Sequence, residues 1–282
     1  MTTLEMVREA ADLLGTAGVE RPRWTAEQLA AAVLGCEPPA FVLEPPAVAP
    51  EQAEEVRRRA VLRAQGVPLQ HLTGIAGFFG HDFLVRPGVF IPRPETERLV
   101  ETAAQEVVRH PGAVVLDVGT GTGAIAISLT LAAPVGTMLG LDMNTGALAL
   151  AAENARRLGA ASRVRWARAD LLSACGAGRA DVIVANLPYI PSSALPDLPR
   201  EIRHDPSLAL DGGPDGLTLI RRLMAQAARV LRRPGTLLLE VGAGQADLIV
   251  REAGQGWGHT AVIADDTGIA RVVMLRRGTA CP

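Results

Sequence analysis

The sequence contains no lysine, and all 28 of its basic residues are arginine. This absence excludes chemistry that depends on a lysine amine, such as Schiff-base formation or the phosphate-binding lysine of a P-loop. Cysteine is also scarce. Cys36, Cys175 and Cys281 lie far apart and form no Cys-x-x-Cys pair, which argues against a disulfide framework. That pattern is typical of a protein from the reducing cytoplasm, where we expect this chain to be found.

Long apolar runs and clusters of metal ligands are missing too. The most apolar stretch, residues 124–133, ends at Pro134 and is too short to span a bilayer. The first 15 residues lack the basic start and apolar run of a signal peptide. The five histidines show no ligand spacing with one another or with cysteine. We therefore expect no membrane association and no metal site.

The balance of charge limits the choice of partners. The 28 arginines face 30 acidic residues, so the net charge is −2 and stable binding to nucleic acid is not expected. Residues 1–75 hold 7 arginines and 10 acidic residues, a local net charge of −3. An acidic N-terminal region favours a partner with a basic surface.

Hydrophobic spacing divides the chain into three parts. Residues 1–75 predict a small helical domain, with helices near 4–14, 25–34 and 50–64 and a proline-rich loop between the last two. Thr25 and Gln28 match a capping box for the second helix. Residues 76–93 predict a β-hairpin linker, with strands at 81–85 and 89–91 flanking the turn Arg86-Pro87-Gly88.

Strands and helices alternate from residue 94 to residue 282. Five apolar strands are expected at 114–119, 137–143, 163–170, 181–189 and 236–242, and residues 259–277 predict two more around a glycine-bearing turn. This alternation is typical of a Rossmann-like α/β domain with helices on both faces of a sheet. The prediction is a seven-stranded, mostly parallel sheet that ends in an antiparallel hairpin.

The first chemical motif is the glycine loop Asp117-Val-Gly119-Thr-Gly121-Thr-Gly123, after the first of these strands. Glycines at this position let the backbone approach a ligand at the start of a helix. Asp117 can meet the ammonium group of a methionyl ligand. Asp142, at the end of the next strand, can accept the hydroxyls of a ribose, and Asp170 can meet an adenine amine. Alternatively these acidic residues cap the following helices, or the loop binds a dinucleotide.

The second motif is Asn186-Leu187-Pro188-Tyr189, at the end of the fourth strand. Asn186 offers a side-chain carbonyl, and the backbone beside Pro188 offers further acceptors for a planar NH2 group. Tyr189 is the only tyrosine of the chain and can pack against the face of such a group. Taken alone, the motif is equally consistent with a strand-to-loop turn that contains a buried asparagine.

In this order, the segments DVGTGTG, LDM, ADLL and ANLPY resemble those of Rossmann-fold methyltransferases that use S-adenosylmethionine and act on a planar nitrogen. Residues 68–101, with the stretch Ile91-Pro-Arg-Pro-Glu-Thr-Glu97, are similar to the linker of the HemK family, the protein-(glutamine-N5) methyltransferases of peptide chain release factors. Residues 205–223 and 237–249 resemble later segments of that family.

The resemblance implies a function and a set of site residues. The reaction would be methylation of the glutamine in the Gly-Gly-Gln motif of a release factor, with S-adenosylhomocysteine as product. The helical domain would recognise the release factor, and we expect a monomer. The implied cofactor-binding residues are Asp117, Gly119, Thr120, Gly121, Thr122, Gly123, Asp142, Met143, Asp170, Leu171 and Asn186. The implied substrate-binding residues are Phe90, Arg93, Asn186, Leu187, Pro188 and Tyr189, of which Asn186, Pro188 and Tyr189 would be catalytic.

Two departures from the family pattern leave alternatives open. Leu187 stands where the family has the first proline of Asn-Pro-Pro-Tyr, and Ile75 stands where it commonly has glutamate. Either change is compatible with a paralogue that methylates a small metabolite or a nucleic-acid base. A third hypothesis is a non-catalytic module that retains cofactor binding.

Overall fold

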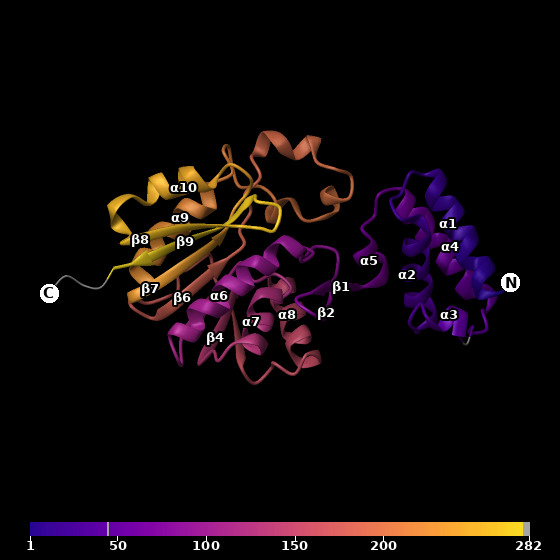
Figure 1. Cartoon of the computed structure of the whole chain (residues 1–282), viewed down its shortest axis with the longest axis horizontal. Coiled ribbons are helices and arrows are strands. Elements are labelled where there is room, and N and C mark those ends of the chain that lie inside the picture. Colours follow the sequence, from indigo (N-terminus) through magenta and orange to yellow (C-terminus); the bar gives the residue numbers. More distant parts are fainter. Residues whose placement is uncertain (44, 279–282) are drawn as a thin grey trace. The chain divides into compact units, whose positions relative to one another are not determined.

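A computed structural model describes residues 1–43 and 45–278. Cys281 lies outside the described residues. The chain divides into two compact units, Met1–Ile75 with Pro199–His204 and Ala76–Leu198 with Asp205–Pro282 (Figure 1). In the described part of the chain, no helix combines the length and the hydropathy that crossing a membrane requires.

The first unit is built from helices. They are α1 (Thr3–Thr16), α2 (Pro22–Leu34), α3 (Ala40–Leu43), α4 (Pro50–Ala64) and α5 (Leu69–Thr73). Thr2 and Glu5 form a capping box that starts α1. Leu14, Leu29 and Val56 are fully buried where α1, α2 and α4 pack together.

Two expectations for this unit were wrong in detail. Helix α2 begins at Pro22, so Thr25 lies inside the helix and caps nothing. Proline is favoured in the first turn because it has no N–H to leave unpaired there. The proline-rich loop contains the short helix α3, which forms because Phe41 is buried in the core of the unit.

The second unit holds the sheet, its helices and the hairpin. The helices are α6 (Glu97–Arg109), α7 (Ala124–Ala132), α8 (Thr145–Arg157), α9 (Thr218–Val230) and α10 (Ala246–Ala253). The strands of the large sheet are β3 (Val114–Val118), β4 (Thr137–Asp142), β5 (Val164–Arg168), β6 (Ala180–Ala185), β7 (Leu231–Glu240), β8 (His259–Ala264) and β9 (Ala270–Arg277).

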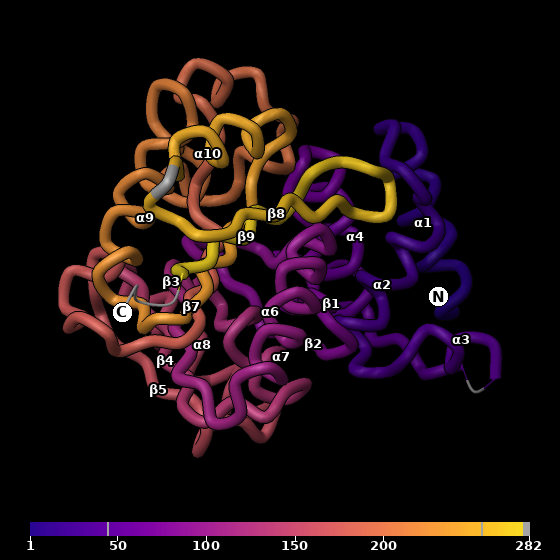
Figure 2. The backbone as a smooth tube through the Cα atoms, turned by 60° about the vertical axis from the view of Figure 1, so that its left-hand side comes forward, coloured from indigo at the N-terminus to yellow at the C-terminus, as the bar shows by residue number. Residues whose placement is uncertain are grey.

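The sheet has seven strands in the order β5-β4-β3-β6-β7-β9-β8. Pairing is parallel from β5 to β7, while β9 runs antiparallel to both β7 and β8. The hairpin of β8 and β9 thus closes one edge of the sheet beside β7 (Figure 2). The predicted mostly parallel sheet with an antiparallel C-terminal hairpin is confirmed.

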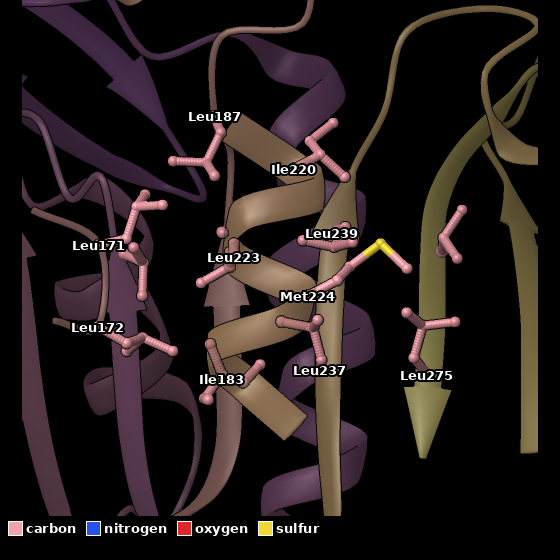
Figure 3. Close-up of a cluster of buried hydrophobic side chains, with 14 of the residues drawn as sticks. Leu171, Leu172, Ile183, Leu187, Ile220, Leu223, Met224, Leu237, Leu239 and Leu275 are labelled. Carbon is pink, nitrogen blue, oxygen red and sulfur yellow. The ribbon is translucent and has the colours of Figure 1, made fainter. Parts of the chain in front are cut away.

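Each face of the sheet is covered by a different set of helices. Successive strand residues point to opposite faces, so Val182 and Val184 pack toward α6 and α7, and Ile183 packs toward α9. Figure 3 shows Ile220, Leu223 and Met224 of α9 lying over β6 and β7. Because both faces are buried, the central strands are mostly apolar, which explains why they were recognisable in the sequence.

The hairpin forms earlier in the chain than expected. Its strands are β1 (Ile75–Phe78) and β2 (His81–Leu84), and residues 89–91 form no strand. The two turn residues, Phe79 and Gly80, both have positive φ, as a two-residue type I′ turn requires. Glu97 Oε1 accepts a hydrogen bond from Phe79 N at 2.8 Å and stabilises this turn. Pro87-Gly88 is a turn, as its composition indicates, but the hairpin does not use it.

Candidate active site

A cavity of about 800 Å³ opens where the parallel strands end in the second unit. Its wall is formed by the segments that follow β3, β4, β5 and β6 and by the segment after the hairpin. The carboxyl edge of an open α/β sheet is the usual place for a ligand site. The predicted site residues that line the cavity are Phe90, Gly119, Thr120, Gly121, Thr122, Asp142, Met143, Asp170, Leu171, Asn186, Leu187, Pro188 and Tyr189.

The glycine loop is held in a curved shape by hydrogen bonds to the next strand. The amides of Gly119 and Thr120 both donate to Leu141 O, at 2.8 and 3.0 Å. Gly119 has φ +77°, and a Cβ atom there would lie 3.0 Å from Leu187 Cδ2. Only glycine suits this position, because a side chain would be strained and would push against the Asn186 turn.

Asp142 connects the loop to the end of β4. Its Oδ2 accepts from Gly121 N at 2.9 Å, and its Oδ1 accepts from Asn144 N at 2.8 Å. Each carboxylate oxygen keeps a second acceptor position, and the residue lies on the cavity wall. Asn144 also donates from Nδ2 to Gly88 O at 3.0 Å, which holds the segment after the hairpin beside this wall.

Asp117 lies beneath the loop and not on the cavity wall. It has no exposed surface, and its Oδ2 accepts from Thr120 Oγ1 at 2.5 Å and from Ala126 N at 3.2 Å. Its Oδ1 is buried and has no hydrogen-bond partner among the described residues. Burial raises the pKa of this carboxyl to about 7. Gly123 likewise starts α7 without lining the cavity.

Asp170 lies on the wall after β5. It is half-exposed and pairs with Arg222 of α9, with 2.7 Å between Oδ2 and Nη2. Leu171, the next residue, has φ +49°, a left-handed conformation that is uncommon outside glycine. Both residues thus face the cavity together with Arg222.

Asn186 follows directly after β6. Its Nδ2 donates to Thr96 Oγ1 at 3.0 Å, and Thr96 is buried just before α6. Glu240, the last residue of β7, is 3% exposed. Burial raises the pKa of the Glu240 carboxyl to about 7, against the opposing effect of hydrogen bonding by Thr96 and Asn186.

The other residues of the turn, 187–189, are held by side-chain packing and by a hydrogen bond to the backbone. Leu187 is buried in the cluster beneath α9, as Figure 3 shows. Tyr189 O accepts from Gln245 Nε2 at 2.9 Å, which holds the backbone after Pro188. Burial raises the pKa of Tyr189 to about 12, so its hydroxyl is neutral near pH 7.

Phe90 and Arg93 have different positions. Phe90 is on the cavity wall, whereas Arg93 lies behind it, with its guanidinium 5.3 Å from the centre of the Phe90 ring. Arg93 also forms an ion pair with the buried carboxylate of Asp205, which in addition accepts from Ile91 N at 3.3 Å. Arg93 therefore supports Phe90 and does not itself line the cavity.

Several residues of the site were missed in the sequence. Thr96 lies within the quoted linker motif, and Glu240 lies within the strand motif LLLEVG, but neither pattern indicates that they meet Asn186. Asn154 of α8 is fully buried and donates from Nδ2 to Thr122 O at 3.0 Å and to Leu84 O at 3.1 Å. It thereby ties β2 to the glycine loop. Leu208 is 88% exposed beside the cavity.

The arrangement offers oxygen acceptors and apolar walls. Within residues 1–43 and 45–278, no three His, Cys, Asp or Glu side chains are placed to hold a metal ion. The cavity wall combines carboxylate and amide oxygens with proline and aromatic side chains, which suits a polar ligand bound beside an uncharged polar group.

Comparison with known proteins gives consistent results for both units. The PrmC N-terminal domain model matches residues 5–74, and a methyltransferase domain model matches residues 109–259. The release factor glutamine methyltransferase of Moorella thermoacetica is 41% identical over 250 residues, 88% of each chain. That of Geobacter sulfurreducens is 38% identical and covers 94% of this chain and 93% of its own. A methyltransferase from Pyrococcus furiosus, 15% identical, shares the fold with a TM-score of 0.54 over 81% of this chain and 98% of its own.

Proposed function

Because this chain belongs to the family of release factor glutamine methyltransferases, we propose that it methylates N5 of the glutamine in the Gly-Gly-Gln motif of peptide chain release factors, with S-adenosylmethionine as methyl donor. One observation carries the proposal. The amide of Asn186 and the glycine loop line the same cavity, so a carboxamide and a methyl donor can meet there.

The residues of the cavity fit S-adenosylmethionine. Residues 119–122 place the backbone of the glycine loop on the cavity wall, where it can approach a ligand closely. Asp142 keeps free acceptor positions for two ribose hydroxyls, and Asp170 and Leu171 form the wall assigned to the adenine. Bound S-adenosylmethionine supplies an electron-poor methyl carbon on a sulfonium.

The orphaned oxygen of Asp117 supports the same assignment. A buried carboxylate without a partner on Oδ1 favours a cationic group nearby, and the methionyl ammonium is such a group. Since Asp117 has no exposed surface, we assign it an electrostatic role through the loop and no direct contact.

The side chains that bind the substrate act by orientation. An amide nitrogen is a poor nucleophile because its lone pair is delocalised, and Tyr189 cannot act as a base because its raised pKa keeps it protonated near pH 7. Asn186 Oδ1 and the backbone carbonyls beside Pro188 would accept both N–H groups, which leaves the lone pair facing the methyl donor. Such positioning contributes up to roughly 7–11 kcal/mol in favourable cases. The same oxygens stabilise the positive charge that develops on nitrogen.

The helical unit would bind the body of the release factor. Val42 and Leu43 of α3 are 74% and 79% exposed and give this acidic unit an apolar surface. The free thiols of Cys36 and Cys175 support a reducing compartment, and we assign the protein to the cytoplasm. We expect it to act as a monomer, which light scattering of the purified chain would test.

The decisive experiment is a methyl-transfer assay followed by peptide mapping. Purified release factors are incubated with the protein and S-adenosylmethionine labelled on the methyl group, and the labelled peptide is sequenced. We expect label only on the glutamine of the Gly-Gly-Gln motif, and none on a release factor in which glutamate replaces that glutamine. Transfer to RNA or to a small metabolite instead would refute the proposal, and cofactor binding without any transfer would indicate a non-catalytic module.

A further inference from the structure

Three residues from distant parts of the chain meet behind the Asn186 turn. The sheet register pairs Ala185 of β6 with Leu239 of β7, so Asn186 and Glu240 occupy the next positions of two adjacent parallel strands. Thr96 reaches the same point from the turn before α6, and its Oγ1 lies 3.0 Å from Asn186 Nδ2. Thr96 is 4% exposed and Glu240 is 3% exposed. Thr96 and Glu240 are therefore largely shielded from water, while Asn186 lies on the cavity wall.

The donors and acceptors that each of the three side chains carries decide the direction of the hydrogen bonds between them. A carboxylate can only accept, and a threonine hydroxyl has one proton to donate. Hydrogen bonding by Thr96 and by Asn186 lowers the pKa of the Glu240 carboxyl, so both side chains direct a proton toward it. The oxygen of Thr96 is then left as an acceptor and must be met by a donor. Asn186 can meet it only with Nδ2, which is the arrangement observed. The acceptor of the asparagine amide, Oδ1, is then left for the cavity.

This direction does not depend on the ionisation of Glu240. Burial raises the pKa of the carboxyl to about 7, with a further contribution from Glu95 and an opposing one from Arg271. Arg271 is itself paired with Asp265 at 2.8 Å. Glu240 Oε2 is buried without a partner in the described part of the chain, so a proton taken up by the carboxyl would reside there. The other oxygen, Oε1, remains an acceptor in both forms.

We propose that Thr96 and Glu240 are positioning residues that fix the amide of Asn186 with its oxygen toward the cavity, and that they thereby select a substrate carboxamide over a carboxylate. This inference rests on the proposed function, since it assigns Asn186 Oδ1 to the N–H of a substrate glutamine. A rotated asparagine would present Nδ2, which repels an NH2 group and attracts a carboxylate.

The first test compares three substitutions of buried threonines. Thr96→Val removes the hydroxyl without changing the shape, and Thr96→Ser keeps it. Thr102→Val removes a hydroxyl of α6 that donates to Arg98 O. We expect T96V to lower kcat at least tenfold, because small misplacements of reacting groups cost up to about 100-fold. T96S should retain at least a third of the wild-type kcat, and T102V should leave it unchanged.

The dissociation constant of S-adenosylmethionine, measured by calorimetry, separates positioning from a general defect. It should change less than threefold in all three variants. Glu240→Leu provides a second route to the same result, because it removes the acceptor of Thr96 while keeping a side chain of similar size. We expect its kcat to fall at least tenfold as well, and a smaller loss in a folded E240L would contradict the role of Glu240.

The second test reads the orientation of the amide without any turnover. Binding of a release factor with its natural glutamine is compared with binding of the version that carries glutamate in its place. The wild type should prefer glutamine, and the preference should shrink at least fivefold in T96V but not in T102V. An unchanged preference together with a T96V kcat within twofold of wild type would overturn the inference. Failure of the wild type to methylate any release factor would instead refute the proposed function. The ratio of the affinities for the glutamine and glutamate versions would still test the orientation of the Asn186 amide.

Discussion

The two sides of the cavity are built in different ways. On the loop side, residues 117–123 are shaped by backbone amides that donate to nearby groups, such as Gly121 N to Asp142, 21 residues apart. On the amide side, Asn186 is held by side chains from other parts of the chain, and its bond to Thr96 joins residues 90 positions apart. The loop side therefore depends on backbone shape, and the amide side depends on the identity of a few side chains.

This difference separates two functions that a methyltransferase needs. The loop side offers a glycine-lined wall and carboxylate oxygens, which suit recognition of the cofactor. The amide side offers one carboxamide that is hydrogen-bonded to the buried side chain of Thr96. Damage to the first should weaken cofactor binding, and damage to the second should slow turnover.

The sharpest test of this separation is Asn186→Ala. We expect kcat to fall on the order of 100- to 1000-fold, because loss of one preorganised polar contact to the reacting group costs about that much. Cofactor affinity should change less than threefold, since the loop and Asp142 remain intact. Single-turnover kinetics and calorimetry measure the two quantities. A large loss of cofactor affinity would show that the two sides are not separate.

The contrast also explains how far the sequence could predict the site. The glycine loop and Asp142 are recognisable as local motifs, and Gly119, Thr120, Gly121 and Asp142 line one cavity. Thr96 and Glu240 were not expected there, because only the register of β6 and β7 and the start of α6 bring them to Asn186.

The position of the hairpin turn was likewise not predictable from the sequence, because it depends on a contact from outside the hairpin. Pro87-Gly88 is the stronger turn signal in the sequence, yet the hairpin turns at Phe79 and Gly80. A phenylalanine with positive φ is uncommon, and here the carboxylate of Glu97 stabilises it from outside the hairpin. Strands such as β6 were easy to predict, because a strand that is buried on both faces has a nearly continuous apolar sequence.

Leu187 joins the two sides and gives the second prediction. It is 5% exposed, packs beneath α9, and occupies the space beside Gly119 that a Cβ atom would need. Leu187→Ala should lower the free energy of unfolding by roughly 2–4 kcal/mol, as truncation of a buried leucine does. Denaturant unfolding measures the change, and Leu208→Ala, at a position 88% exposed, is the matched control. Equal stabilities for both variants would contradict the packing described for Leu187.

A smaller effect is expected for Asp142→Ala on the loop side. The substitution removes the acceptor of Gly121 N and the proposed ribose contact, so the dissociation constant of S-adenosylmethionine should rise roughly 10- to 30-fold, about 1.4–2 kcal/mol. At saturating cofactor, kcat should remain within threefold of wild type. Asp170→Ala is the comparison, because that carboxylate is half-exposed and paired with Arg222. A loss of kcat in D142A at saturating cofactor would break the division between the two sides.

The smallest expected effect concerns the buried carboxyl on each side. Burial raises the pKa of Asp117 and of Glu240 to about 7 in the folded protein, whereas both groups ionise near their ordinary values in the unfolded chain. Between pH 8 and pH 6 the folded state therefore binds more protons, and the free energy of unfolding should increase as the pH falls. That stabilisation is fully present below the unfolded pKa values and is lost as the pH rises through 7. Each group contributes about 1 kcal/mol over this interval.

The two contributions can be separated by substitution. Asp117→Asn keeps an oxygen for Thr120 Oγ1 and Ala126 N but cannot titrate, so the pH dependence of its melting temperature should be about half that of the wild type. Glu240→Gln should remove the other half. All other titratable groups are common to the three proteins, so their effect cancels in the comparison. The ligand-free proteins are melted at pH 6, 7 and 8. An identical pH dependence in D117N and wild type would mean that Asp117 is ionised throughout, and that its buried Oδ1 has a partner after all.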